Sequence, residues 1–341
     1  MTLNLCRPVV SFLLLLPLIG EAQSSLFTNT FETPTSEPID WLGDEFEDAR
    51  SLGQFEQIWQ REHWPFDSLD VRSINQGVPG HLLLIPRSSG WWEDYRAELT
   101  YKELSGNFVA TTLVRPRNRV GQNPGASAPG SSQGGQPETE YSLGGLMVRA
   151  PRRNVEQDNA QWQRGHEAYI FLSMGAADLP GRFQFEDKTT RANPFPPNPS
   201  QSTRLITDAA AQTDAAHLRL IRIGPHMLLL FQELSSQAAP QPWRVLRRFF
   251  RPDLPERVQL GFVAYTDWAT MRWCSYEHHN RNVLTQSCDN PPQPADPDLA
   301  VSFDFFRLER PDLTAPELML DWSNPGVISD TRILTSFGFA P

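Results

Sequence analysis

Residues 107–115, Asn-Phe-Val-Ala-Thr-Thr-Leu-Val-Arg, decide the fold class of this chain. Phe108, Ala110, Thr112 and Val114 recur with a period of two, which places them on one face of a β-strand. Further strands are predicted at 81–85, 97–103, 143–150, 168–174, 182–188, 217–223, 227–234, 257–266 and 301–308. So many strands with so little helix predict an all-β fold of two packed antiparallel sheets.

The N-terminus has the pattern of an export signal. Arg7 precedes a short apolar run at 11–19, and small residues at Gly20 and Ala22 suit cleavage. No later stretch approaches the roughly 18 apolar residues of a membrane-spanning helix. We therefore expect a protein that is secreted or periplasmic, without a membrane span. The net charge of −10 also argues against binding to nucleic acid.

Composition divides the chain into four parts. Residues 1–22 form the signal peptide, and 23–43 lack periodicity and read as a flexible leader. The sandwich is predicted at 44–310, with a glycine-rich mobile insertion at 121–139 that buries too little apolar surface to fold alone. The C-terminal tail at 311–341 has no clear period, so it either docks on the sandwich or stays disordered.

After the signal, two cysteines remain, Cys274 and Cys288. In an oxidising compartment such a pair predicts a disulfide, with free thiols as the alternative. A ring of about 15 residues would stabilise the fold by about 3 kcal/mol if the bond is unstrained.

Several segments together resemble a known family, across roughly 44–310. They are 106–112, 144–149, 218–222, Trp243, 258–264 and 301–307. They resemble concanavalin A-like lectin and glucanase jelly rolls, and most of all the secreted bacterial group labelled DUF1349. The resemblance implies a curved two-sheet sandwich whose concave face often binds saccharide, and a last strand that pairs with the first near Phe46. Because this fold serves lectins, hydrolases, lyases and interaction modules, it implies little about activity.

A catalytic motif is missing from the sequence. Retaining glucanases of this fold carry Glu-x-Asp-x-x-Glu on one strand, which places two carboxylates on the same face. The nearest acidic run, 44–48, has the wrong spacing. We therefore expect no enzyme, but a hydrolase or lyase with an unfamiliar acid/base pair stays open, with Glu167 and Asp267 as weak candidates.

Strand alternation predicts a shared polar face. Its members come from distant strands: Arg149, Glu167, Tyr169, Lys188, Tyr265 and Asp267. Aromatic rings mixed with charges suit sugars, which stack on rings and need paired donors and acceptors. The alternative interpretation is a solvated sheet face with cross-strand ion pairs.

An aromatic and acidic cluster at 90–95 is a second candidate for sugar stacking. Its candidate ligand-binding residues are Trp91, Trp92, Glu93 and Tyr95, and Trp268 is interpreted in the same way. The alternative is that these large rings pack in the core.

Metal ligation has little support. His278 and His279 are adjacent and lack partners at tetrahedral spacing, so no metal site is predicted. Acidic loops at 289–290 and 296–298 could hold a structural calcium ion, and no other cofactor is expected.

The sequence thus predicts a secreted lectin-like sandwich whose partner is an oligo- or polysaccharide. Two alternatives stay open: a polysaccharide hydrolase or lyase, and a laminin-G-like module that binds a protein.

Overall fold

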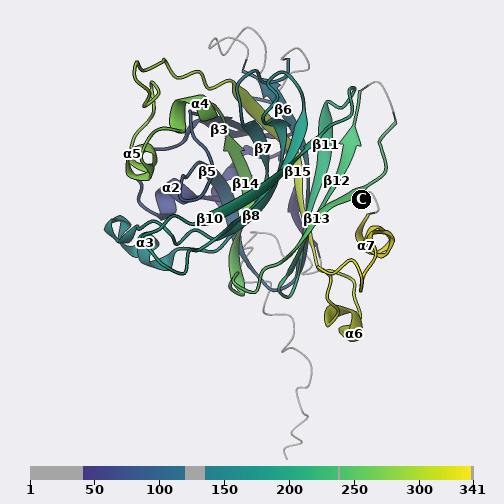
Figure 1. Cartoon of the computed structure of the whole chain (residues 1–341). Coiled ribbons are helices and arrows are strands. Elements are labelled where there is room, and N and C mark those ends of the chain that lie inside the picture. Colours follow the sequence, from purple (N-terminus) through teal and green to yellow (C-terminus); the bar gives the residue numbers. More distant parts are fainter. Residues whose placement is uncertain (1–40, 120–134, 237–238, 339–341) are drawn as a thin grey trace, which may run out of the picture.

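The computed structural model describes residues 41–119, 135–236 and 239–338 (Figure 1). The predicted signal peptide, most of the leader and most of the insertion lie outside these residues. Two antiparallel sheets dominate the fold, which confirms the predicted all-β jelly-roll sandwich. Within the described part, no helix is long and apolar enough to cross a membrane.

The seven-stranded sheet carries the predicted polar face. Its order is β10 (Gln201–Asp208), β9 (Gln184–Arg191), β8 (Tyr169–Ala176), β7 (Ser142–Arg149), β14 (Arg257–Tyr265), β5 (Glu98–Ser105) and β2 (Glu56–Gln57). The central strands are apolar because both of their faces are covered.

The eight-stranded sheet packs against its inner face. Its order is β13 (Arg244–Phe250), β12 (His226–Leu234), β11 (Ala215–Ile223), β6 (Phe108–Asn118), β15 (Leu299–Glu309), β4 (Leu82–Pro86) and β3 (Leu69–Ile74), and β1 (Trp41–Asp44) pairs with β15. The last strand therefore pairs with the first, as the family resemblance implies. The pairing begins at Trp41, so residues 41–43 belong to a strand instead of the predicted leader.

The core between the sheets is built around Phe262. Its ring lies 4.6 Å from that of Phe303 and 5.8 Å from that of Phe46, centre to centre. Phe108, Ala110 and Val114 of β6 point into the same core, as their alternation predicts. Tilted and edge-on contacts of this kind stabilise a sandwich beyond the burial of area alone.

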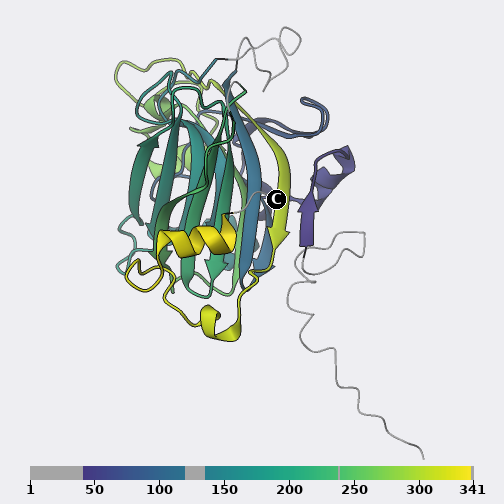
Figure 2. The ribbon, with the colours of Figure 1, turned by 90° about the vertical axis from the view of Figure 1, so that its right-hand side faces the viewer.

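Short helices cover the outer faces of the two sheets. Over the seven-stranded sheet lie α2 (Ile58–Arg61), α3 (Arg153–Gln157), α4 (Trp268–Met271) and α5 (Tyr276–Arg281), with the 3-10 turns η1 (Ala49–Gln54) and η2 (Asn159–Gln161) elsewhere in the loops. Over the other sheet lie α6 (Ala315–Leu318) and α7 (Asp330–Phe337), and Figure 2 shows α7 across the strands.

The described part of the C-terminal tail docks on the sandwich. Trp322 and Ile333 are fully buried against Ile221, Leu228 and Trp243 of the eight-stranded sheet and its neighbouring loop. An apolar outer face on this sheet is thus covered by the chain's own end.

Candidate functional site

Side chains on the outer face of the seven-stranded sheet follow the predicted alternation. Leu146 and Val148 enter the core, whereas Met147 and Arg149 point outward. The same holds for Tyr169 on β8, Lys188 on β9 and Tyr265 on β14, and these strands are neighbours. The structure therefore brings four of the predicted residues, Arg149, Tyr169, Lys188 and Tyr265, onto one face.

One part of this face is filled by a buried ion network. Arg149 binds Glu62 at 2.7 Å and Glu167 at 2.8 Å, and Arg152 binds Glu167 at 3.0 Å. The side chain of Arg149 is fully buried, and that of Glu167 is 4% exposed. Burial alone would raise the pKa of the Glu167 carboxyl, but the two arginines lower it to about 2. Arg149 and Glu167 are thus held in buried ion pairs and have almost no exposed surface that a ligand could contact.

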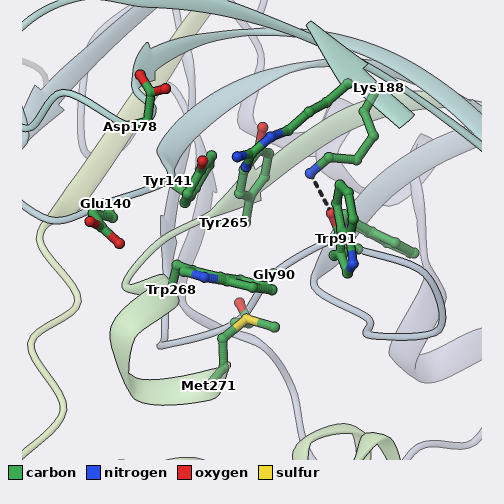
Figure 3. A pocket seen from close by; sticks show the side chains of 12 residues that line it. Gly90, Trp91, Glu140, Tyr141, Asp178, Lys188, Tyr265, Trp268 and Met271 are labelled. Carbon is green, nitrogen blue, oxygen red and sulfur yellow. Dashed lines mark hydrogen bonds between the residues drawn. The ribbon is translucent and has the colours of Figure 1, made fainter. Parts of the chain in front are cut away.

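A cavity of about 350 Å³ lies on the same face, next to this network (Figure 3). Its aromatic lining is Trp91, Trp92, Tyr141, Tyr265 and Trp268. Its charged lining is Glu140, Asp178, Lys188 and Arg204. Trp91 contacts both regions, because it lines the cavity while its ring centre lies 6.0 Å from the Arg149 guanidinium carbon.

The inner wall of the cavity is a hydrogen-bonded polar cluster. The Tyr265 hydroxyl donates to Glu186 at 2.6 Å and lies 2.7 Å from Ser173 Oγ. Lys188 Nζ donates to the Trp91 carbonyl oxygen at 2.6 Å and pairs with Glu186 at 3.0 Å. Burial, with the nearby Glu186 charge, raises the pKa of Tyr265 well above its usual value, so the phenol stays protonated. The polar groups of this wall therefore hold one another in place, and the Tyr265 proton is already donated to Glu186.

The opposite wall is the short helix α4, which carries Trp268 and Met271 into the cavity. Asp267 adopts a left-handed backbone conformation (φ 62°) and caps this helix. Its carboxylate accepts from Ser88 Oγ at 2.6 Å and from the Asp296 amide at 2.8 Å, and the residue is 3% exposed. Asp267 thus positions Trp268 and is not among the residues that line the cavity.

The outer edge of the cavity comes from β10, a strand that the sequence analysis did not identify. Its Arg204 lies over the rings of Tyr141, at 4.6 Å, and Trp92, at 5.7 Å. Burial raises the pKa of Tyr141 to about 12, so its hydroxyl is a donor at neutral pH. The period-two spacing of Ser202, Arg204 and Ile206 could have identified this strand in the sequence. The strand is polar and mostly exposed, however, so its apolar pattern is weak.

The remaining predicted ligand residues surround the site without lining it. Tyr169 packs edge-on against Trp91 at 5.2 Å. The Tyr95 hydroxyl donates to the Cys274 carbonyl oxygen at 2.6 Å, and Glu93 accepts from the Tyr276 hydroxyl. The core-packing interpretation therefore describes Trp91 and Tyr95, which are 1% and 7% exposed. Trp92 and Trp268 are only half-buried.

Cys274 and Cys288 form a disulfide, as predicted. Among the described residues, these cysteines and His278 are the group with metal-ligand atoms close together, within 4.8 Å. Because both sulfurs are in the disulfide, neither is available as a thiolate ligand. In the acidic loops, Asp298 anchors the described end of the insertion, accepting from Thr139 Oγ1 at 2.6 Å and Ser142 Oγ at 2.7 Å.

No protein family and no curated protein matches this sequence. The structure is similar to a functionally unknown protein from Saccharomyces cerevisiae, with a TM-score of 0.42 and 14% identity over 76% of this chain and 98% of that one. It is also similar to basic winged bean lectin with Tn-antigen (TM-score 0.41, 8% identity, 80% and 98% covered) and to LamAcat from Zobellia galactanivorans (0.39, 10%, 79% and 96%). At these scores, neither ligand nor activity follows from the similarity.

Proposed function

We propose that this protein is an exported, lectin-like sandwich that binds a saccharide in the cavity between Trp91 and Trp268. The single observation that carries the proposal is the lining of this cavity, which combines five aromatic side chains, among them the half-buried Trp92 and Trp268, with cationic and carboxylate groups. Aromatic faces bind the apolar face of a sugar ring, and the polar groups pair with its hydroxyls.

The size of the cavity supports a short ligand. At about 350 Å³ it lies near the lower end of the roughly 300–1,000 Å³ range of small-molecule sites. The ion network around Arg149 fills the neighbouring part of the face, so a polysaccharide cannot lie along the whole sheet. We therefore propose that the site takes a short oligosaccharide or the end of a longer chain.

The place of action is part of the proposal. The export signal at 1–22 and the disulfide between Cys274 and Cys288 support a secreted or periplasmic location.

A printed glycan array, followed by calorimetric titration of the best-binding glycan, tests the site. We expect Trp268→Ala to weaken binding about tenfold or more, because a stacking ring is lost, a change of about 1.4 kcal/mol. Trp273→Ala is the matched control: Trp273 lies on the same loop, is 64% exposed and does not line the cavity. Equal losses in the two variants, or an array without any bound glycan, would contradict the proposal.

One observation favours the alternative of a polysaccharide-acting enzyme. Glu140 and Asp178 place two carboxylates in the same cavity, and acid/base cleavage of a glycosidic bond uses a pair of carboxyl groups on either side of that bond. Release of reducing ends or unsaturated sugars by the wild type, lost in Glu140→Gln or Asp178→Asn, would establish this activity in place of simple binding.

A further inference from the structure

Two cations face the cavity from neighbouring strands. Lys188 of β9 and Arg204 of β10 are directly opposite partners in the antiparallel ladder, so their side chains lie on the same face. Lys188 Nζ lies 5.4 Å and the Arg204 guanidinium carbon 5.7 Å from the same ring centre, that of Trp92. Like charges directly opposite each other destabilise a sheet, so this pair requires a compensating partner.

The protein compensates only part of this charge. Glu186 pairs with Lys188, but the same carboxylate also accepts the hydrogen bond of Tyr265. Burial lowers the pKa of Lys188, Glu186 offsets part of this effect, and the Arg204 charge lowers the pKa again. Among the residues that the structure describes, no carboxylate lies within ion-pair distance of Arg204. Its guanidinium lies over the rings of Trp92 and Tyr141 instead.

Donor capacity is also left over at this point. An ammonium group has three N–H donors, and Lys188 uses its own toward the Trp91 carbonyl oxygen and Glu186. Arg204 has five N–H donors and is largely exposed. Both side chains line the cavity, so a ligand atom between them would meet donors from two strands.

The acidic groups lie on another side of the cavity. Figure 3 shows Glu140 and Asp178 together across the cavity from Lys188. Asp178 already accepts from Gln184 Nε2 at 3.0 Å, which holds it at the rim. These carboxylates suit sugar hydroxyls, whereas the Lys188 and Arg204 side suits an anionic oxygen.

We infer that the ligand is an acidic saccharide whose carboxylate or sulfate group is bound between Lys188 and Arg204. Because Glu186 already pairs with Lys188, a neutral sugar would leave one positive charge of the cross-strand pair uncompensated, whereas a singly charged anionic group between the two side chains would neutralise it. The saccharide part of this inference rests on the proposed sugar-binding function. The anion-binding part does not, because it is argued from Lys188 and Arg204 alone.

Matched pairs of neutral and acidic sugars test the inference by titration. The probes are the methyl glycosides of glucose, galactose and mannose, each against its uronic acid and its 6-sulfate, with acetate and inorganic sulfate as anions without a sugar. We expect the wild type to bind an acidic member about tenfold or more tightly than its neutral partner at low salt, and less so as salt rises.

Arg204→Gln should abolish this preference, because it removes one cation without burying a polar group. Arg182→Gln is the matched control, since Arg182 is exposed, precedes β9 and does not line the cavity. The uronate and sulfate arms identify which anionic group is preferred. Folding of each variant is checked by circular dichroism.

The outcomes separate the inference from the function on which it rests. Equal binding of neutral and acidic sugars, or an acid preference that survives Arg204→Gln, overturns the inference and leaves sugar binding intact. Binding of acetate or sulfate that depends on Arg204, without binding of any sugar, supports the anion site and overturns the proposed function. Absence of binding by every probe overturns both.

Discussion

At the residue scale, the buried ion network makes a sharp prediction about stability. Glu167→Gln removes the carboxylate that binds both Arg149 and Arg152, and leaves the first guanidinium buried with one charged partner fewer. Loss of one partner of a buried pair costs about 3–5 kcal/mol, so we expect a decrease of about 3 kcal/mol in the free energy of unfolding. Urea denaturation at neutral pH measures the change.

Two further variants make this test decisive. Arg50→Ala breaks a surface pair with Asp48 and should leave stability unchanged, because exposed pairs contribute little. Arg149→Met should destabilise the protein by at least as much as Glu167→Gln, because it leaves two buried carboxylates, Glu62 and Glu167, with one cationic partner fewer. A Glu167→Gln protein as stable as the wild type would show that the network is hydrated.

Alternation predicted which residues share a face but not which of them a ligand can reach. The period of two placed Arg149, Tyr169, Lys188 and Tyr265 correctly, because it depends only on the local backbone. Burial of Arg149 depends on α2, α3 and the loops beside them, and these come from distant parts of the chain. The sequence therefore predicted which side chains share the outer face of the sheet. The position of the cavity on that face could not be predicted, because it depends on which residues the loops cover.

At the scale of elements, the disulfide holds the wall that carries Trp268. Helix α4 has four residues, too few to be stable alone. Cys274 follows it closely and is bonded to Cys288, and its carbonyl oxygen accepts from Tyr95. The wall is thus fixed from three sides, by the Asp267 cap, the disulfide and this hydrogen bond.

Removal of the disulfide should therefore lower both the stability and the sugar affinity of the protein while leaving its fold intact. For Cys274→Ser with Cys288→Ser, we expect an unchanged far-ultraviolet dichroism spectrum and a free energy of unfolding lower by about 3 kcal/mol. Sugar affinity should fall as well, because Trp268 loses its fixed position. Chemical reduction of the wild type should reproduce both effects. Full affinity in the double serine variant would show that the cap and Tyr95 suffice.

Edge strands were the elements that the sequence analysis missed. β3 and β10 lie at the ends of their sheets, where each strand has a neighbouring strand on one side only and its side chains are less completely buried. Their polar residues weaken the periodic signal that identified β6, β7 and β14. Because β10 supplies Arg204, the missed strand was also the one that completes the site.

At the scale of the whole molecule, two buried titratable groups give stability opposite dependences on pH. Glu98 is fully buried and accepts from Thr100 Oγ1 at 2.7 Å. Burial, aided by Asp67, raises its pKa from the usual 4.5 to about 7. Burial lowers the pKa of His279 from 6.5 to about 4.

The sign of each contribution follows from which state binds the proton more tightly. Glu98 binds its proton more tightly when folded, so its contribution is complete below pH 4.5 and is lost as pH rises to about 7. His279 binds its proton more tightly when unfolded, so its contribution is lost as pH falls from 6.5 through about 4. Between pH 4.5 and 6.5 the two slopes oppose each other.

Glu98→Gln isolates the carboxyl term, because glutamine keeps the shape and cannot ionise. Relative to the wild type, the variant should gain stability as pH rises from 5 to 8, by an amount on the order of 3 kcal/mol. Urea unfolding at pH 5, 6, 7 and 8 measures this difference. Burial also raises the pKa of Asp187 to about 7, but Asp187 is present in both proteins, so its contribution cancels in the difference. His279→Gln should show the reverse trend, gaining on the wild type as pH falls from 6.5 to 4. A difference between Glu98→Gln and the wild type that stays constant with pH would mean that Glu98 is hydrated and ionises at its usual pKa.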